Sequence, residues 1–167
     1  MSHSEHKHNA PGKVKCAVLT ISDTRTRKND ESGKLILEKL KDSGHEVKFY
    51  EIISDNLPLI VNVIKQVMCG NVDVVITNGG TGIAKRDVTI EAVRKILNKE
   101  LTGFGELFRM LSYEEIGSSA MMSRALAGTL KGGGVIICIP GSIHAVELAL
   151  NKLILPELGH LVWEANR

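Results

Sequence analysis

The sequence predicts an α/β protein, a three-layer α/β/α sandwich with a mostly parallel sheet between two layers of helices. Short apolar runs alternate along the chain with stretches of helical periodicity, the pattern of parallel sheets joined by helices. The runs are apolar at nearly every position, as expected for strands covered on both faces. The chain of 167 residues has no internal repeat and no linker-like stretch, so we expect one domain.

The first half of the chain contains two predicted strands, each followed by a helix. Residues 14–22, VKCAVLTIS, predict a buried strand, and a helix over 31–43 follows, ended by Gly44. Residues 45–53, HEVKFYEII, predict the second strand. The next helix begins near Pro58 and carries an apolar stripe at i, i+3, i+4, i+7 and i+8.

The second half repeats this order. Residues 72–77, VDVVIT, predict the third strand, and a helix is expected over 88–98. Residues 104–130 are predicted to be helical, although they are rich in Gly, Ser and Met. Residues 135–139, VIICI, predict the last strand, and the C-terminal stretch is predicted to be a helix broken at Pro156.

Composition excludes several classes of function. The 21 Lys and Arg against 19 Asp and Glu give a net charge of only +2, which argues against a protein that coats nucleic acid. Aromatic residues are 4% of the chain, too few for a base-stacking platform. No run of 18 apolar residues indicates a membrane span, and the polar residues 1–12 lack the apolar centre of a secretory signal.

Other features of the composition favour a soluble cytoplasmic protein. The three cysteines are widely spaced, and two of them, Cys16 and Cys138, lie in apolar runs, where reduced thiols pack as small hydrophobes. Residues 1–12 are expected to form a flexible leader whose histidines could bind a metal adventitiously. Positive charge is concentrated in residues 1–28, which carry six Lys or Arg against two acidic residues.

Polar or glycine-rich groups follow every predicted strand, and the carboxyl ends of strands are where open α/β sheets bind ligands. Ser22 and Asp23 follow the first strand and Asp55 follows the second. The third strand leads into a glycine-rich turn, and the last one ends at Gly141 and Ser142. A sheet with a purely structural role does not need such groups at every strand end.

The glycine-rich turn consists of Gly79, Gly80, Thr81 and Gly82. Its backbone N–H groups can approach a ligand closely and form an anion-binding concavity. It is neither a Walker A loop nor a GxGxxG motif. The alternative is a tight turn that only joins a strand to a helix.

Two carboxylates and a basic run have two interpretations each. Asp87 can cap the next helix, or it can hold Mg²⁺ beside a phosphate loop. Asp55 has the same ambiguity: it is either a turn former or a carboxylate that can hold Mg²⁺. The basic residues Arg25, Arg27 and Lys28 form either a solvated loop or a screen for an anionic ligand.

A hydroxyl-rich stretch that contains Ser123 and Arg124 also has two interpretations. Its small side chains suit a close helix crossing, and its hydroxyl and guanidinium donors suit a phosphate or a polar heterocycle. No Ser-His-Asp arrangement indicates nucleophilic catalysis by the protein. The residues alone therefore predict a protein that binds a phosphorylated ligand, with or without Mg²⁺.

Four motifs together identify a family that the chain resembles. TNGGTGIAKRDVTIEAV, GFGELFR, SRALAG and IPGSIHAVE occur in this order, and VLTISDTR precedes them. Their order and spacing closely resemble the MoaB/MogA family of molybdenum cofactor biosynthesis proteins. The resemblance covers roughly residues 13–165, and the domain is therefore expected over 13–167.

The resemblance implies a Rossmann-like molybdopterin-binding fold, assembly as a trimer or a dimer of trimers, and contact with other cofactor-synthesis enzymes. It also implies transfer of an adenylyl group from Mg-ATP to molybdopterin, with release of pyrophosphate. Asp55 and Asp87 then become the functional carboxylates, with Asp87 assisting Mg²⁺. The family's pattern implies one cleft that is lined by residues of all the motifs: Gly79 to Gly82, Arg86, Glu106, Ser123, Arg124, Gly141 and Ser142.

The chain departs from the family's pattern at two positions. The pattern has proline where this chain has Ile90, and again where it has Ile143. The first position lies near a helix start, where loss of proline is structurally mild. The second lies in a loop that is expected to touch substrate. The alternative function is therefore a molybdopterin-binding module of the same pathway that binds or carries the pterin without catalysis.

Overall fold

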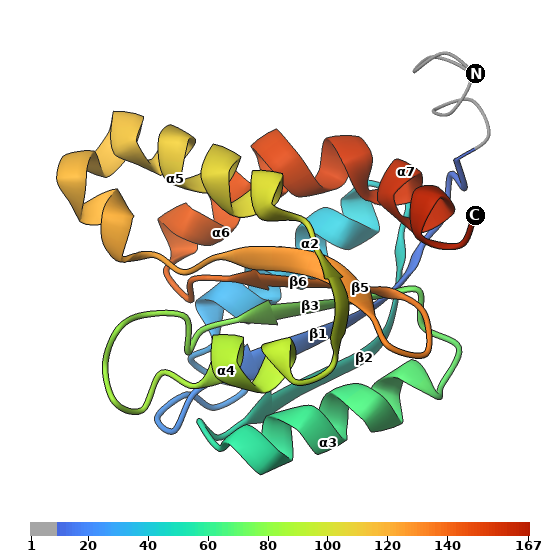
Figure 1. Cartoon of the computed structure of the whole chain (residues 1–167), viewed down its shortest axis with the longest axis horizontal. Helices are drawn as coiled ribbons and strands as arrows, with labels where there is room; N and C mark the ends of the chain where they lie inside the picture. Colours follow the sequence, from blue (N-terminus) through green and yellow to red (C-terminus); the bar gives the residue numbers. More distant parts are fainter. Residues whose placement is uncertain (1–9) are drawn as a thin grey trace.

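The computed structural model describes residues 10–167, which form a six-stranded sheet between two layers of helices (Figure 1). The strand order is β2-β1-β3-β6-β5-β4. Residues 1–9, which hold the three histidines of the predicted leader, lie outside the described residues. The strands are β1 (Lys15–Ile21), β2 (Glu46–Ile53), β3 (Val74–Asn78), β4 (Leu97–Glu100), β5 (Leu126–Leu130) and β6 (Val135–Ile139).

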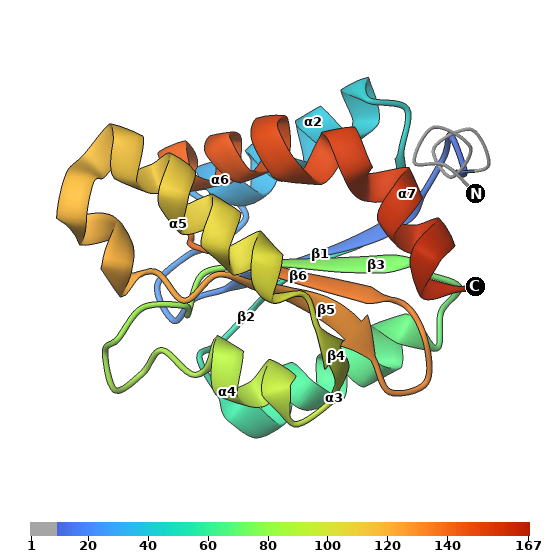
Figure 2. The same ribbon diagram turned by 45° about the horizontal axis from the view of Figure 1, so that its top comes forward.

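The helices cover both faces of the sheet, as the apolar pattern of the strands predicts. One layer consists of α3 (Leu57–Met68) and α4 (Thr89–Arg94). The other consists of α2 (Glu31–Asp42), α5 (Thr102–Ile116), α6 (Ile143–Ala149) and α7 (Leu155–Ala165), and Figure 2 shows them together on one side. The predicted three-layer α/β/α class is therefore confirmed.

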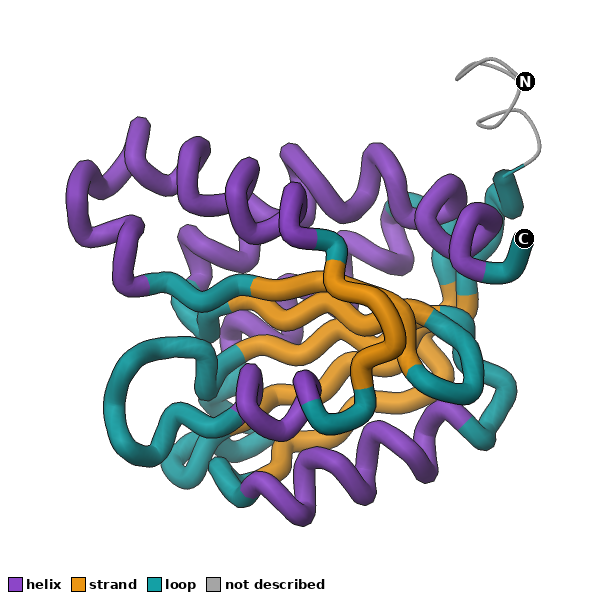
Figure 3. Tube along the Cα trace, in the orientation of Figure 1, coloured by secondary structure: helices purple, strands orange, loops and turns teal. Residues whose placement is uncertain are grey.

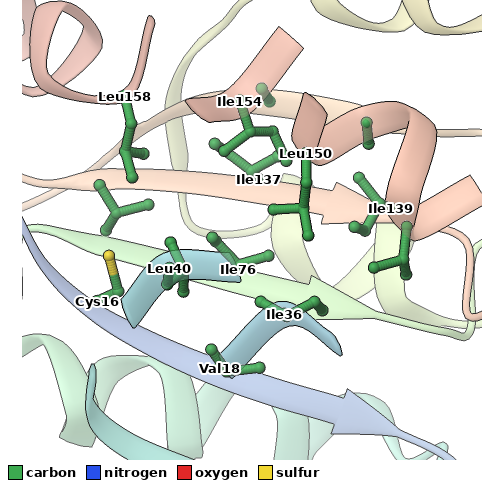
Figure 4. Close-up of a cluster of buried hydrophobic side chains, with 14 of the residues drawn as sticks. Cys16, Val18, Ile36, Leu40, Ile76, Ile137, Ile139, Leu150, Ile154 and Leu158 are labelled. Carbon is green, nitrogen blue, oxygen red and sulfur yellow. The ribbon is translucent and has the colours of Figure 1, made fainter. Parts of the chain in front are cut away.

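The core forms two clusters, one on each face of the sheet. On the face of α2 and α6, strand residues such as Val18 and Ile76 pack against Ile36, Leu40 and Leu150 (Figure 4). All five of these side chains are inaccessible to solvent. Burial of this kind contributes about 1.5–3 kcal/mol for each large aliphatic side chain, so the two clusters hold the strand ends rigidly.

The four strands predicted from the sequence are β1, β2, β3 and β6, and they are parallel to one another. The chain passes from β1 outward to β2 and then returns to β3 on the other side of β1. Their carboxyl ends consequently meet at one edge of the sheet. The loops at this edge are the long teal segments at the left of Figure 3.

Two further strands were predicted wrongly as helix. The helix expected over 88–98 ends at Arg94, and β4 follows; the helix expected over 104–130 ends before β5, after a 3₁₀-helix at Gly117–Met122. β5 is antiparallel to both β4 and β6. A Cβ at Gly128 of β5 would collide with the carbonyl of Lys99 in β4, so glycine permits this close pairing and tertiary contact overrides local propensity.

The C-terminal stretch is not broken at Pro156. A π-helical turn at Leu150–Ile154 joins α6 to α7, and Pro156 occupies the first turn of α7, where its missing N–H has no intrahelical acceptor. Of the predicted leader, residues 10–12 are described. The Pro11 carbonyl lies so close to Gly159 that a Cβ there would approach it to 2.5 Å.

Candidate functional site

A polar cavity of about 180 Å³ lies at the carboxyl ends of β1, β2, β3 and β6. It is the place that the arrangement of polar strand ends predicts. The structure brings together eight of the predicted site residues around it: Ser22, Asp23, Asp55, Gly79, Gly80, Arg86, Asp87 and Gly141. We call this cavity the carboxylate cleft, because Asp23, Asp55 and Asp87 line it.

The glycine-rich turn forms the floor of the carboxylate cleft. Gly79 and Gly80 have φ angles of +100° and +63°, which favour glycine. A Cβ at Gly79 would collide with the carbonyl of Ile21, so the turn also needs glycine for space. The N–H of Gly79 donates to the carbonyl of Ile139 at 3.0 Å, and Thr89 donates its hydroxyl to the Gly79 carbonyl at 3.0 Å. The turn thus joins β3 to the loop after β6.

Asp55 is the least satisfied carboxylate of the cleft. Its Oδ1 is buried and has no hydrogen-bond partner among the described residues, while its main-chain N–H donates to Asp23 Oδ1 at 3.1 Å. Burial raises the pKa of the Asp55 carboxyl, and the negative charges of Asp23 and Asp87 raise it further, although Arg86 opposes them. A cation or a proton would stabilise this oxygen.

Asp87 faces the same cavity from the loop between β3 and α4. Its Oδ2 accepts a hydrogen bond from the N–H of Ala84 at 2.8 Å, inside the loop. The predicted role of Asp87 as a helix cap is wrong, because α4 begins after Val88 and has no side-chain cap. A Cβ at Gly82 would come within 2.7 Å of Asp87 Oδ2, so glycine gives this carboxylate its space.

A buried polar network lies beneath the cleft, and sequence reasoning missed it. Its centre is Asp30, which is inaccessible to solvent and accepts hydrogen bonds from Thr20 Oγ1 at 2.5 Å and Tyr50 Oη at 2.7 Å. Burial by itself would raise the pKa of Asp30, but these bonds, with those from Gly33 and Arg25, hold it below its ordinary value. The only signal in the sequence is the position of Asp30 as the N-cap of α2.

The basic run of the sequence divides. Arg25 points inward: it donates to Asp30 Oδ1 at 3.0 Å and to the Gly141 carbonyl at 2.8 Å. Arg27 turns away and lies over the ring of Tyr50, with its guanidinium carbon 5.2 Å from the ring centroid. Lys28 is exposed, and its carbonyl accepts a hydrogen bond from Lys34. Arg25 and Arg86 are therefore the basic residues that line the cleft.

A second cavity of about 400 Å³ is lined by α5, β5 and the segment between them. Glu106, Ser123 and Arg124, which were expected in one common cleft, line this cavity instead. Arg109 lines it too, and sequence reasoning missed it although it ends the GFGELFR motif. We call this cavity the α5 cavity.

Arg124 lines the α5 cavity and donates hydrogen bonds to the loop that carries Asp87. Its Nε donates to the Gly82 carbonyl at 2.8 Å and its Nη2 to the Asp87 carbonyl at 2.9 Å. It also forms an ion pair with Glu91, which holds the pKa of that carboxyl below its usual range. The Thr81 carbonyl accepts from both the main-chain N–H and the Nε of Arg124, each at 3.3 Å, so Arg124 holds the glycine-rich turn in place.

Ser142 has a structural role that the sequence did not predict. It is the N-cap of α6, and its Oγ accepts a hydrogen bond from the N–H of Ala145 at 3.2 Å. Ser142, Thr81 and Gly82 line neither of the two cavities.

Comparison with known proteins gives the family. Residues 17–160 match the family described as "Probable molybdopterin binding domain". A relative from Bacillus cereus, "Molybdenum cofactor biosynthesis protein B", is 58% identical over 100% of this chain and 99% of its own. The protein of the same name from Bacillus subtilis is 52% identical, over 100% of this chain and 99% of its own. The chain belongs to the MoaB family.

Solved structures of MoaB proteins share the fold. A crystal structure of molybdenum cofactor biosynthesis protein B superposes with a TM-score of 0.90 at 56% identity, and covers 95% of this chain and 99% of its own. A tungsten cofactor synthesizing MoaB from Pyrococcus furiosus superposes with a TM-score of 0.87 at 37% identity, over 95% and 100% of the two chains. The resemblance of the motifs to molybdenum cofactor biosynthesis proteins is confirmed.

Two findings on the described residues concern metals and membranes. No group of three or more His, Cys, Asp or Glu side chains is placed to hold a metal ion within residues 10–167. In the same part of the chain, no helix has both the length and the apolar character of a membrane span.

Proposed function

We propose that this MoaB-family protein transfers an adenylyl group from Mg-ATP to molybdopterin. The terminal phosphate oxygen of molybdopterin attacks the α-phosphorus of ATP, the bond from that phosphorus to the β-phosphate oxygen breaks, and pyrophosphate leaves. The observation that carries the proposal is the position of Asp55 and Asp87, which line one polar cavity beside the glycine-rich turn. The membership of the chain in a molybdopterin-binding family supports the choice of acceptor.

The reaction makes modest demands on the protein, because both reacting groups belong to the substrates. No side chain has to form a covalent intermediate, and rate acceleration comes from positioning and from neutralisation of charge. A cavity of about 180 Å³ with polar walls suits phosphate groups. Arg25 and Arg86 line it and would offset repulsion between the two polyanionic substrates.

The carboxylates fit a magnesium ion that arrives with ATP. Mg²⁺ in nucleotide sites is held by one or two carboxylates together with phosphate oxygens and water. The buried Oδ1 of Asp55, which has no partner among the described residues, is the best-placed ligand, and the Asp87 carboxylate is the second. When bound, the ion would neutralise charge at the phosphates, and the two aspartates would hold the ion and, through it, the phosphates.

The two departures from the family's pattern, Ile90 and Ile143, do not change which residues line the carboxylate cleft. Ile90 is 1% exposed and packs in the core cluster of α3 and α4. Ile143 is the first residue of α6, directly after its N-cap Ser142, and is 40% exposed. Neither side chain lines the cavity that holds Asp55 and Asp87. We therefore expect that isoleucine in place of proline at these two positions does not abolish catalysis.

We also propose that the protein assembles with copies of itself, as a trimer or a dimer of trimers. α5 and the 3₁₀-helix after it expose an unusual number of large apolar side chains to solvent, which marks an interaction surface. These residues, the α5 face, are Leu107, Met110, Tyr113, Ile116, Met121 and Met122, each 48–76% exposed. Cytoplasmic location and contact with other cofactor-synthesis enzymes are part of the same proposal.

The decisive experiment supplies purified protein with molybdopterin and Mg-ATP and measures pyrophosphate release together with adenylyl-molybdopterin. We expect turnover by the wild type and a loss of at least about 100-fold in Asp55→Asn and Asp87→Asn. Asp42→Asn, at the exposed end of α2, is the matched control and should remain active. Tight molybdopterin binding without pyrophosphate release by the wild type would replace this proposal with the carrier function.

A further inference from the structure

The Arg25 side chain lines the carboxylate cleft, and hydrogen bonds from both terminal nitrogens of its guanidinium hold it in place. Its Nη1 donates to Asp30 Oδ1 at 3.0 Å and also to Ser32 Oγ, while its Nη2 donates to the Gly141 carbonyl at 2.8 Å. Arg25 therefore links the loop after β1 to the loop after β6, and both loops line the cleft. The Arg25 side chain is 30% exposed and that of Asp30 is fully buried.

A guanidinium has five N–H donors. The bonds to Asp30, Ser32 and Gly141 engage three of them within the described residues. The remaining donors belong to a side chain that lines the cavity. A planar guanidinium with a fixed edge is well suited to bind phosphate oxygens with its free donors.

The buried charge of Asp30 is more than a helix cap requires. An N-cap needs one side-chain oxygen, and Asp30 Oδ1 meets this need by accepting from the Gly33 N–H at 3.0 Å. A serine or an asparagine would do the same without a buried charge. Burying a carboxylate is costly unless it is paired, and replacing a buried ion pair by neutral groups is often neutral or stabilising. Its use at this position thus points to a role at the cleft.

We propose that Asp30 is a positioning residue that holds the Arg25 guanidinium in the carboxylate cleft for the phosphates of a polyphosphate substrate. Asp30 itself touches no ligand and acts through Arg25. The Gly33 N–H and Arg25 both donate to Oδ1 of the carboxylate, which orients Arg25 toward the cavity, whereas Thr20 and Tyr50 donate to Oδ2. The inference rests on the proposed function, because it assigns the phosphates to this cleft.

The variant Asp30→Asn distinguishes two effects on anion binding: the positioning of Arg25 and the negative charge of Asp30 itself. The asparagine keeps the volume and the capping oxygen, but it removes one negative charge beneath the cleft, which by itself would strengthen binding of an anion. Loss of a fixed guanidinium weakens binding, because an otherwise free side chain must then be immobilised by the ligand. We therefore expect affinity for inorganic pyrophosphate, measured by calorimetry, to fall roughly fivefold. Unchanged or tighter binding would overturn the proposal.

Tyr50→Phe is the matched control. It removes a hydrogen bond to Oδ2 of the same carboxylate, whereas Arg25 binds Oδ1, and Tyr50 does not line the cleft. If Asp30 were only structural, both variants would lower thermal stability and neither would change pyrophosphate affinity at a temperature where both are folded. We expect Tyr50→Phe to lower stability and to bind pyrophosphate as the wild type does.

The coupling between the two residues gives a second readout. In an Arg25→Gln background, Asp30→Asn should change pyrophosphate affinity less than twofold, because the side chain that it positions is gone. An undiminished effect would contradict the proposal. If Asp30→Asn does not fold, Arg25→Lys tests the same pair: it keeps the charge but cannot reach Asp30 and Gly141 together, and it should weaken binding similarly.

Nuclear magnetic resonance of ¹⁵N-labelled arginine side chains tests positioning without any ligand. We expect separate Nη–H signals of Arg25 in the wild type and in Tyr50→Phe, where the guanidinium is fixed. In Asp30→Asn the guanidinium should rotate freely, and the separate signals should merge. Identical Arg25 spectra in all three proteins would refute the proposal. A wild type that binds no pyrophosphate would instead refute the assignment of the phosphates to this cleft, so the two failures are distinguishable.

Discussion

The guanidinium of Arg124 donates to the main-chain carbonyl of Asp87 at 2.9 Å, and so ties a residue just before β5 to the loop that carries a cleft carboxylate. The same side chain donates to the Gly82 carbonyl at 2.8 Å. Two segments that are 37 residues apart in the sequence are thereby fixed to each other. The position of Asp87 consequently depends on an arginine that lines a different cavity.

Arg124→Gln should displace Asp87 without removing it. The loss of charge-assisted bonds to two carbonyls and of the ion pair with Glu91 is expected to cost about 1.5–3 kcal/mol of stability and to lower adenylylation at least tenfold. Thermal unfolding and the pyrophosphate assay measure the two effects. Arg167→Gln, which removes an exposed ion pair with Glu164, is the control and should change neither.

Gly79→Ala should lower the stability of the protein far more than Gly132→Ala, although the two glycines have the same φ. Gly79 and Gly132 both have φ +100°, so alanine is strained equally at each, by about 1–2 kcal/mol. Only at Gly79 would the new Cβ collide with a carbonyl, that of Ile21, whereas nothing lies within 4 Å of a Cβ at Gly132. Chemical denaturation should show the larger loss of stability in Gly79→Ala. Equal losses would show that the turn can move away from β1.

Asp55→Asn should stabilise the protein while abolishing its activity. The folded-state pKa of Asp55 is raised by burial and by Asp23 and Asp87, so the folded state holds the proton more tightly than the unfolded state. Stability from this group therefore falls as the pH rises through the unfolded-state and then the folded-state pKa. At pH 7 the variant should melt at a higher temperature than the wild type, because it lacks the buried negative charge.

The pH profile provides the check on this prediction. The difference in melting temperature should shrink as the pH falls below the unfolded-state value for aspartate, because both proteins then carry a neutral side chain. A variant that is less stable than the wild type at pH 7 would show that the Asp55 carboxylate has a partner that stabilises it. Added Mg-ATP should narrow the difference at pH 7, because it binds the wild type preferentially.

Charges on the α5 face should break the proposed assembly. Met110 and Ile116 are 54% and 58% exposed, so the double variant Met110→Glu and Ile116→Glu should fold normally as a monomer. Light scattering should give a mass near 18.2 kDa for this variant and a multiple of that for the wild type. Lys65→Glu, on the exposed side of α3, should keep the wild-type mass. A monomeric wild type would refute self-association.

The position of the carboxylate cleft could be predicted from the sequence, because it depends on the order and direction of the strands. Four apolar runs predicted the parallel strands, and parallel strands bring Asp23, Asp55, the glycine-rich turn and Gly141 to one edge whatever the details of packing. The glycines of the turn were also recognisable, since a positive φ at Gly79 and Gly80 excludes most other residues.

Features that depend on contacts between distant segments were not predictable in this way. β4 and β5 have helix-compatible compositions, and only their pairing, with Gly128 at the close approach, makes them strands. Arg25 and Arg27 are two residues apart, yet one points into the cleft and the other lies over Tyr50. No local pattern distinguishes them, because the partners that separate them, Gly141 for Arg25 and Tyr50 for Arg27, are distant in the sequence.

The sequence by itself determined the class of fold, the edge of the sheet at which the carboxylate cleft lies, and the family, since each follows from local periodicity or from residues in a fixed order. The tertiary structure decided which charges face the cleft. Asp30 became the buried partner of Arg25, and Arg124, which lines the α5 cavity, became bonded to the glycine-rich turn and to the loop that carries Asp87. The physical reason is that a charge acquires its role from the partners and the burial around it, and these are set by packing between segments that are distant in the chain.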